Sequence, residues 1–151
     1  MSLTYHHDRR PDIDAIRALY AASPLRRPIG EPERIAKMFE HANVVISAYD
    51  GERLVGLLRG WTDFAFDGYV CDLAVHPGYQ KRNIGKRLLD EAAALGPDIH
   101  WILLASPIAK DYYGHLGWQL IPNAWELPRP SGAMPGYAEY QAEFADLARR
   151  A

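Results

Sequence analysis

The sequence contains a single cysteine, no marked excess of charge of either sign, and no long apolar run. One cysteine, Cys71, cannot form an internal disulfide, which fits a reducing compartment. The net charge of −2 gives no strong positive field that would favour nucleic acid or an anionic membrane surface. The apolar runs, such as residues 101–105, are too short to cross a bilayer, and residues 1–10 lack the apolar stretch of a secretory signal. We therefore expect a cytoplasmic protein that binds neither nucleic acid nor a membrane.

What is present is enough apolar material for one ordinary domain, because 48% of the 151 residues are hydrophobic. No internal repeat, charge run or low-complexity tract divides the chain. We therefore expect a single domain that spans residues 1–151.

Apolar residues recur with the period of a helix in some segments and with that of a strand in others. Helices are predicted over residues 12–22, 32–41, 84–95, 106–117 and 137–147. Strands are predicted over residues 3–6, 44–49, 54–61, 68–75, 101–105, 118–121 and 124–127. Antiparallel strands come first and a strand–helix–strand–helix order follows, which is typical of a mixed α/β sheet with parallel pairing in its second half.

The most informative segment joins the strand that ends at Val75 to the helix that begins near Asn83. The N-terminus of that helix presents free backbone N–H groups and the positive end of the helix dipole, a combination that binds phosphate. Asparagine at position 83 tolerates a left-handed backbone, and glycine at position 85 removes a side chain where a phosphate would press on the main chain. Four cations surround this loop: Lys81, Arg82, Lys86 and Arg87.

This loop lacks the P-loop pattern GxxxxGK[ST] and the dinucleotide-binding pattern GxGxxG. Its spacing alone leaves two readings open: a phosphate site, or a glycine-containing loop with solvated cations that merely starts a helix. The segment resembles the cofactor motif of the GNAT superfamily of N-acetyltransferases, V-x-P-x-x-[QR]-x-x-G-x-[GA]. The matching residues are Val75, Pro77, Gln80 and Gly85, while Asn83 stands where the family usually has glycine.

A second segment, from Ser106 to Trp118, resembles the N-x-x-A-x-x-[FL]-Y-x-x-x-G-[FW] motif of the same superfamily. Ser106 replaces the frequent asparagine of this motif. The matching residues are Ala109, Tyr112, Tyr113, Gly117 and Trp118. The resemblance covers residues 69–118, about a third of the chain.

The resemblance implies the acyl-CoA N-acyltransferase fold, in which helices flank a central mixed β-sheet of six to seven strands; an extra C-terminal helix would follow here. It also implies acetyl-CoA as co-substrate, and no metal. The pyrophosphate of coenzyme A would lie on Gln80, Lys81, Arg82, Asn83, Ile84, Gly85 and Lys86. The pantetheine arm would pair like a strand with backbone groups of Leu73, Ala74 and Val75, where a main-chain N–H polarises the thioester.

By the same resemblance, Tyr113 is the general acid that protonates the departing thiolate of coenzyme A. A tyrosine has an unperturbed pKa of about 10, so it carries its proton at neutral pH. The alternative is a core tyrosine, since Ile108, Tyr112 and Leu116 form an apolar stripe on the same predicted helix. Tyr113 is expected to lie off that stripe.

Asp72 is the candidate general base, because burial inside an otherwise apolar strand would raise the pKa of its carboxyl group. The alternative is a structural aspartate that is paired with an arginine or a tyrosine hydroxyl. Asp63 and Asp67, in the loop before this strand, are candidates for holding a cationic substrate.

Four aromatic residues flank the expected substrate entrance, and they line either an apolar amine pocket or the core: Trp61, Phe64, Phe66 and Tyr69. Cys71 is interpreted as a small buried thiol rather than as an acyl-cysteine nucleophile partnered by His76. The apolar stripe within residues 137–147 covers either the domain's own core or a homodimer contact.

The leading prediction is direct transfer of an acetyl group from acetyl-CoA to a primary amine of a small molecule. Three alternatives remain open. One is a catalytically silent acyl-CoA-binding module that regulates a partner, which the departures at Asn83 and Ser106 suggest. The others are a protein N-terminal or lysine acetyltransferase, and a phosphate-binding domain unrelated to this superfamily.

Overall fold

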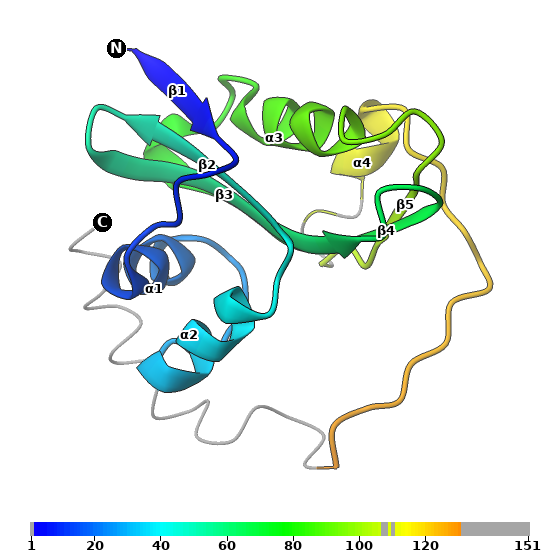
Figure 1. The fold of residues 1–151 in the computed structure, drawn as a ribbon, viewed down its shortest axis with the longest axis horizontal. Coiled ribbons are helices and arrows are strands. Elements are labelled where there is room, and N and C mark those ends of the chain that lie inside the picture. The colour runs from blue at the N-terminus through cyan, green and yellow to red at the C-terminus, as the bar shows by residue number, and fades with distance from the viewer. Residues whose placement is uncertain (1, 107–108, 110, 131–151) are drawn as a thin grey trace.

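The computed structural model describes residues 2–106, 109 and 111–130 (Figure 1). The described residues form five strands, four helices and one short 3₁₀ turn before α3. In chain order they are β1 (Leu3–His6), α1 (Ile13–Ala22), α2 (Pro32–Glu40), β2 (Val44–Asp50), β3 (Arg53–Thr62), β4 (Asp67–Val75), η1 (Pro77–Tyr79), α3 (Ile84–Ala93), β5 (His100–Leu103) and α4 (Tyr112–His115). Among these described helices, none is long and apolar enough to span a bilayer.

The strands form one mixed sheet in the order β1-β2-β3-β4-β5. The first four strands pair antiparallel, and β5 pairs with β4 in parallel. The predicted mixed α/β sheet, with parallel pairing in its second half, is therefore confirmed.

The predicted count of six to seven strands is wrong for the described part of the chain, which has five. Residues 118–121 and 124–127 have the alternation of strands but pair with no described strand, and Leu120, Trp125 and Leu127 are exposed. An apolar alternation favours a strand only where a sheet edge accepts its backbone hydrogen bonds. The predicted C-terminal helix at 137–147 lies outside the described residues.

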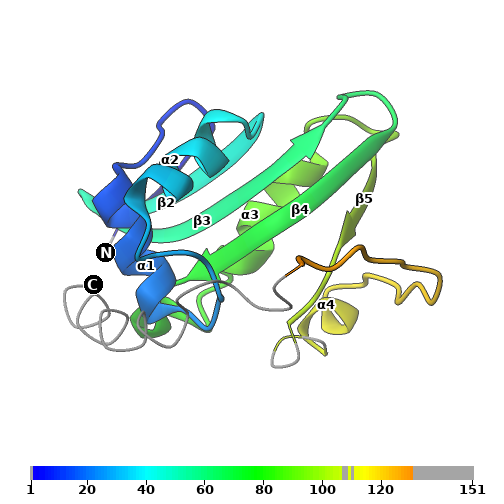
Figure 2. The same ribbon diagram turned by 90° about the horizontal axis from the view of Figure 1, so that it is seen from below.

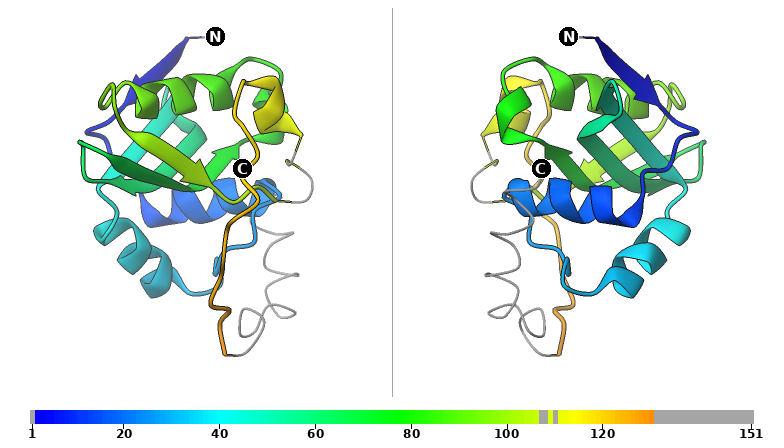
Figure 3. Two further views of the ribbon diagram at one scale, coloured as in Figure 1. Left: turned by 90° about the vertical axis from the view of Figure 1, so that its right-hand side faces the viewer. Right: turned by 90° about the vertical axis from the view of Figure 1, so that its left-hand side faces the viewer.

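Helices cover both faces of the sheet, as Figure 3 shows. On one face α1 and α2 bury a cluster around Ile16, Leu19 and Leu57. On the other face α3 buries a second cluster around Ile84 and Leu88, and residues of α4 pack at its margin. Each fully buried leucine or isoleucine contributes about 1.5–3 kcal/mol, so these two clusters hold the layers together.

The strand β4 contains a β-bulge at Cys71. Arg59 of β3 is paired with Asp72, but the next residue, Gly60, is paired with Val70, so Cys71 is an extra residue. A bulge bends its strand and shifts the alternation of side chains. Val70 accordingly packs on the α3 side, whereas Asp72 turns towards α1. Only glycine fits at position 60, because an added Cβ would lie 2.3 Å from the carbonyl oxygen of Tyr69.

Beyond the bulge, β4 leaves its parallel neighbour. The pairing of β4 with β5 covers only Asp67–Val70 and His100–Leu103. The following residues of β4, up to Val75, still pair with β3 but have no strand on their other side in the described part of the chain. Figure 2 shows β5 turning away from β4 towards α4. This open edge ends at the loop that leads into α3.

Candidate active site

The loop before α3 adopts the conformation that a phosphate site requires. Lys81 and Asn83 both have positive φ, of 62° and 60°. The predicted left-handed conformation of Asn83 is therefore confirmed, as is the start of the helix, because Asn83 is its N-cap. No side chain caps α3, so the backbone N–H groups of its first turn remain available to a ligand.

The four cations of this loop have different surroundings. Lys81 and Arg82 are exposed, and the Arg82 guanidinium lies 5.0 Å from the centroid of the Tyr79 ring. The Tyr79 hydroxyl donates to Asp50 over 2.6 Å, which ties the turn η1 to β2. Arg82 thus makes a cation–π contact with Tyr79, whose ring is positioned by Asp50 near the end of the open edge.

The two cations on α3 form ion pairs along the helix. Lys86 contacts Asp90 over 2.6 Å, and Arg87 contacts Glu91 over 2.8 Å, each with the i,i+4 spacing of neighbours on one helix face. A surface hollow of about 390 Å³ lies against this part of the helix, and it is lined by Tyr5, Arg82, Asn83, Lys86, Arg87 and Asp90. The first turn of α3 therefore presents two cations in ion pairs on its outer side, beside its free N–H groups.

Gly85 is buried on α3, where it contacts α4. A Cβ added to Gly85 would lie 2.7 Å from the hydroxyl oxygen of Tyr112. From the sequence, we expected glycine here because a phosphate would approach the main chain. The structure shows that glycine at this position also lets Tyr112 pack against α3. Sequence reasoning missed this contact, because the two residues belong to different helices.

Tyr113 is half-buried on α4 and packs at the edge of the α3-side cluster. Its ring lies 5.3 Å from that of Tyr112 and 5.9 Å from that of Trp118. The expectation was that Tyr113 lies off a stripe of Ile108, Tyr112 and Leu116. Tyr113 instead packs against the same cluster as Leu116, whereas Tyr112 is 38% exposed and Ile108 lies outside the described residues. Burial raises the pKa of Tyr113, so its hydroxyl remains protonated at neutral pH. A tyrosine in this state can still give up a proton to a stronger base.

The open edge of β4 carries the backbone that was expected to hold the pantetheine. Leu73 and Val75 are half-buried and turn towards the α3-side cluster, whereas Ala74 is buried on the opposite face. Their pairing with β3 leaves the other edge of the strand available for an added strand.

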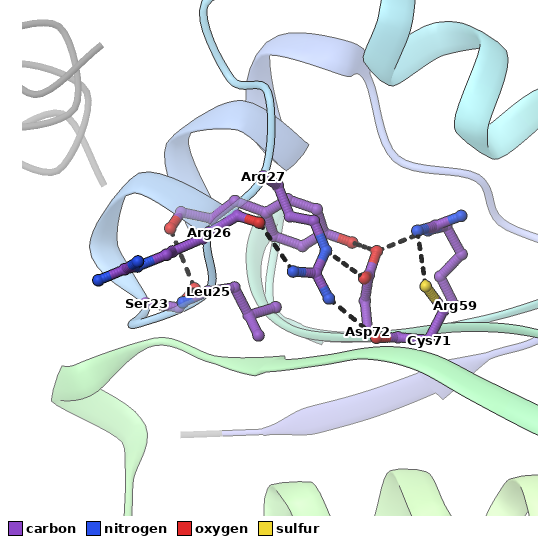
Figure 4. A network of polar contacts seen from close by, with 8 residues as sticks. Ser23, Leu25, Arg26, Arg27, Arg59, Cys71 and Asp72 are labelled. Atoms are coloured by element: carbon purple, nitrogen blue, oxygen red, sulfur yellow. Dashed lines mark hydrogen bonds and ion pairs between the residues drawn. The ribbon is translucent and has the colours of Figure 1, made fainter. Parts of the chain in front are cut away.

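Asp72 lies at the centre of a buried polar network beneath the bulge (Figure 4). Its side chain is 0% exposed, and it accepts three hydrogen bonds from three different parts of the chain. The Tyr20 hydroxyl of α1 donates over 2.7 Å, Nε of Arg27 over 2.6 Å, and Nε of Arg59 over 2.5 Å. Arg27 also donates to the carbonyl oxygen of Cys71 over 2.9 Å. The network therefore ties the linker between α1 and α2 to the bulge of β4.

The expectation that burial raises the pKa of Asp72 is wrong. Burial does act in that direction, but the hydrogen bond from Arg59 and the charges of Arg27 and Arg59 outweigh it and hold the pKa below the ordinary value. The structure shows the alternative, a carboxylate paired with arginines and a tyrosine hydroxyl. A carboxylate whose pKa is lowered in this way is a weak proton acceptor, and its hydrogen bonds join the linker and α1 to β3 and β4.

Cys71 and His76 do not form a catalytic pair. The half-buried thiol accepts a hydrogen bond from Nη2 of Arg59 over 3.1 Å, and burial together with the charge of Asp72 raises its pKa. His76 instead accepts the N–H of Gly78 over 3.0 Å. The interpretation of Cys71 as a small, unreactive thiol agrees with this geometry.

The four aromatic residues of the expected entrance separate into two pairs. Trp61 and Tyr69 stack with their centroids 6.4 Å apart, and both are half-buried. Phe64 and Phe66 are 53% and 70% exposed at the tip of the β3–β4 hairpin. Asp63 shapes this tip, because its carboxylate accepts three backbone N–H groups, and these bonds lower its pKa. All three bonds go to Oδ1 of Asp63.

Comparison with known proteins agrees with this geometry. The sequence model of the acetyltransferase (GNAT) family matches residues 13–118, and the chain belongs to that family. It is 28% identical over 126 residues to the probable acetyltransferase TAP2 of Glycine max, covering 74% of this chain and 50% of that protein. The chain thus spans about half the length of the curated relatives it matches.

Solved structures share the fold. A probable acetyltransferase of meticillin-resistant Staphylococcus aureus superposes with a TM-score of 0.72 at 19% identity, covering 85% of this chain and 98% of that one. The PaiA N-acetyltransferase of Thermoplasma acidophilum, solved in complex with coenzyme A, superposes with a TM-score of 0.61 at 15% identity, covering 82% and 94%. At these identities the likeness concerns the fold.

Proposed function

We propose that this protein transfers an acetyl group from acetyl-CoA directly to a primary amine of a small molecule. The observation that carries the proposal is the open edge of β4, which leads straight to the uncapped N-terminus of α3. A strand edge and a helix N-terminus in succession suit a ligand that has an amide-containing arm and a pyrophosphate.

The residues of the site fit that ligand. Backbone groups of Leu73, Ala74 and Val75 pair with the arm, and the loop from Gln80 to Lys86 holds the pyrophosphate through backbone N–H groups and nearby cations. Acetyl-CoA supplies a thioester, whose carbonyl carbon the acceptor amine attacks. The PaiA N-acetyltransferase of the same fold was solved with coenzyme A, which supports this choice of co-substrate.

Tyr113 supplies the proton that the reaction needs at sulfur. As the amine nitrogen bonds to the carbonyl carbon, the carbon–sulfur bond breaks and the Tyr113 hydroxyl protonates the leaving thiolate. The raised pKa of Tyr113 keeps this proton in place before the step. Asp72 is already bonded to three donors, so the acceptor amine reacts in its neutral form and loses one proton to solvent as the amide forms. Solvent then returns a proton to the Tyr113 phenolate.

The test is the release of coenzyme A, followed with a thiol reagent across a panel of primary amines. The Tyr113→Phe variant should lose about 10²–10⁴-fold in kcat, the usual contribution of a general acid, while acetyl-CoA still raises its melting temperature. The Tyr112→Phe variant is the matched control, because it changes the neighbouring ring and keeps Tyr113. Tight acetyl-CoA binding without release for any amine would instead identify a regulatory acyl-CoA-binding module.

A further inference from the structure

Within the described part of the chain, the network around Asp72 carries a net positive charge. Arg27 and Arg59 are both charged, because burial lowers their pKa values but Asp72 raises them by more. Burial and the charge of Asp72 keep Tyr20 and the Cys71 thiol neutral. Two positive charges and one negative charge therefore leave a net charge of +1 beneath the bulge of β4.

Arg27 is the member of this network that solvent can reach. Its side chain is 23% exposed, against 5% for Arg59 and 0% for Asp72. A guanidinium has five N–H hydrogens, and the contacts to Asp72, Arg26 and Cys71 use one on each of the three nitrogens of Arg27. One hydrogen remains on Nη1 and one on Nη2 in the described part of the chain. A guanidinium that has N–H groups left on both Nη1 and Nη2 suits the two oxygens of a carboxylate.

Among the described residues of the linker, β3 and β4, no other acid offsets this charge. The linker between α1 and α2, residues 23–31, has a second arginine, Arg26, and its only acid, Glu31, contacts Arg34 over 3.2 Å. Along β3 and β4 the only acids are Asp72 and Asp67, and Asp67 lies at the far hairpin end of β4. A polycationic acceptor would meet repulsion here, whereas an anionic group would be attracted.

Arg27 lies next to the part of β4 where the thioester is proposed to bind. Its Nη2 donates to the carbonyl of Cys71, the bulge residue two positions before Leu73. Behind Arg27, the buried guanidinium of Arg59 lies 5.1 Å from the ring centroid of Trp61, and the half-buried Trp61 stacks on Tyr69. An acceptor at the bulge would therefore meet a cation beside an apolar, aromatic wall.

We propose that the acceptor is an amine that also carries a carboxylate and an apolar side chain, and that Arg27 binds the carboxylate. This inference rests on the proposed acetyl transfer and names its substrate class. The group transferred and the proton balance are those of the proposed reaction. Arg27 adds a preference for amines that carry a carboxylate.

The test compares acceptors that differ only in the carboxylate. Phenylalanine, phenylalaninamide and phenethylamine form one set, and leucine, leucinamide and isoamylamine form a second. Coenzyme A release gives kcat/KM for each, divided by the fraction of neutral amine at the assay pH so that amine pKa does not bias the comparison. The carboxylate member should be favoured by at least about tenfold, the ratio that one charge-assisted hydrogen bond supplies.

Three variants test whether the preference for a carboxylate depends on the charge of Arg27. Arg27→Gln should reduce that preference to near unity through KM for the acceptor, with KM for acetyl-CoA unchanged, and Arg27→Lys should keep much of it. Lys37→Gln removes an exposed cation from α2 and should change nothing, which makes it the control. Wild-type preference for the amide or the plain amine overturns the inference and leaves acetyl transfer standing. If no acceptor leads to release of coenzyme A, both the inference and the proposed acetyl transfer are overturned. The comparison of acceptors uses the wild-type protein, so it does not depend on the folding of any variant.

Discussion

Replacing Asp72 by asparagine is the sharpest test of the polar network, because it keeps the shape of the side chain and removes the only negative charge between two arginines. The side chain of Arg59 is 5% exposed, so it cannot turn to solvent to recover its hydration. Breaking a buried ion pair by removing one partner costs about 3–5 kcal/mol, since the remaining charge stays buried. For a protein of this size each kcal/mol corresponds to a shift of about 2–4 °C, so the melting temperature should fall by roughly 6–20 °C.

The measurement is thermal and urea unfolding of Asp72→Asn and of the double variant Asp72→Asn/Arg59→Met. The double variant removes one charge of each sign and should recover a large part of the loss, because no fully buried charge is left alone. Unfolding of Asp72→Asn at the wild-type temperature would refute the description of this network as buried and paired.

The pH dependence of stability gives an independent check on the same group. The pKa of Asp72 is lower in the folded protein than in the unfolded chain, so its stabilising contribution is fully present above the unfolded pKa, about 4. That contribution is lost as the pH falls through the folded pKa. Wild-type stability should therefore decline more steeply below pH 4 than that of Asp72→Asn, when both are followed by urea unfolding across this range.

Two further substitutions test the contacts of α3. Gly85→Ala should be more favourable by about 1 kcal/mol in thermal unfolding on the Tyr112→Phe background than in the wild type, because only the wild type has the Tyr112 hydroxyl that the new Cβ meets, while the helix propensity of alanine acts in both; the same effect on both backgrounds would contradict the contact. Asn83→Gly should raise stability by up to about 1 kcal/mol, since glycine adopts the φ of 60° without strain, and calorimetry should show acetyl-CoA binding equal to wild type or tighter; a marked loss of binding would mean that the loop geometry is wrong.

The elements and the loop were predictable from the sequence because their signals are local. A turn, an asparagine at the N-cap and an apolar period of helical spacing predict the start of α3 without knowledge of the rest of the chain. The strand prediction at 68–75 is within one residue of β4. The predicted strands after Gly117 were wrong because a strand also requires a partner, which a local pattern does not specify.

The state of Asp72 was not predictable, because it depends on residues brought together by the fold. Its three donors lie 13, 45 and 52 residues away in the sequence. Burial alone would have raised the pKa, and only the positions of the two arginines reverse the direction. The bulge was invisible for a related reason, since residues 68–75 are as apolar as those of a regular strand.

Cys71 can be regarded as a one-residue insertion. Neighbours in a regular strand point to opposite faces, so a chain without Cys71 would leave Val70 and Asp72 on the faces they now occupy. Such a chain would lose the bend, and β5 could continue its ladder alongside the second half of β4. The shorter protein would gain backbone hydrogen bonds and lose the place where a substrate arm can be added. A family could therefore acquire or abolish this site by a single codon, with the layers on either side of the sheet left as they are.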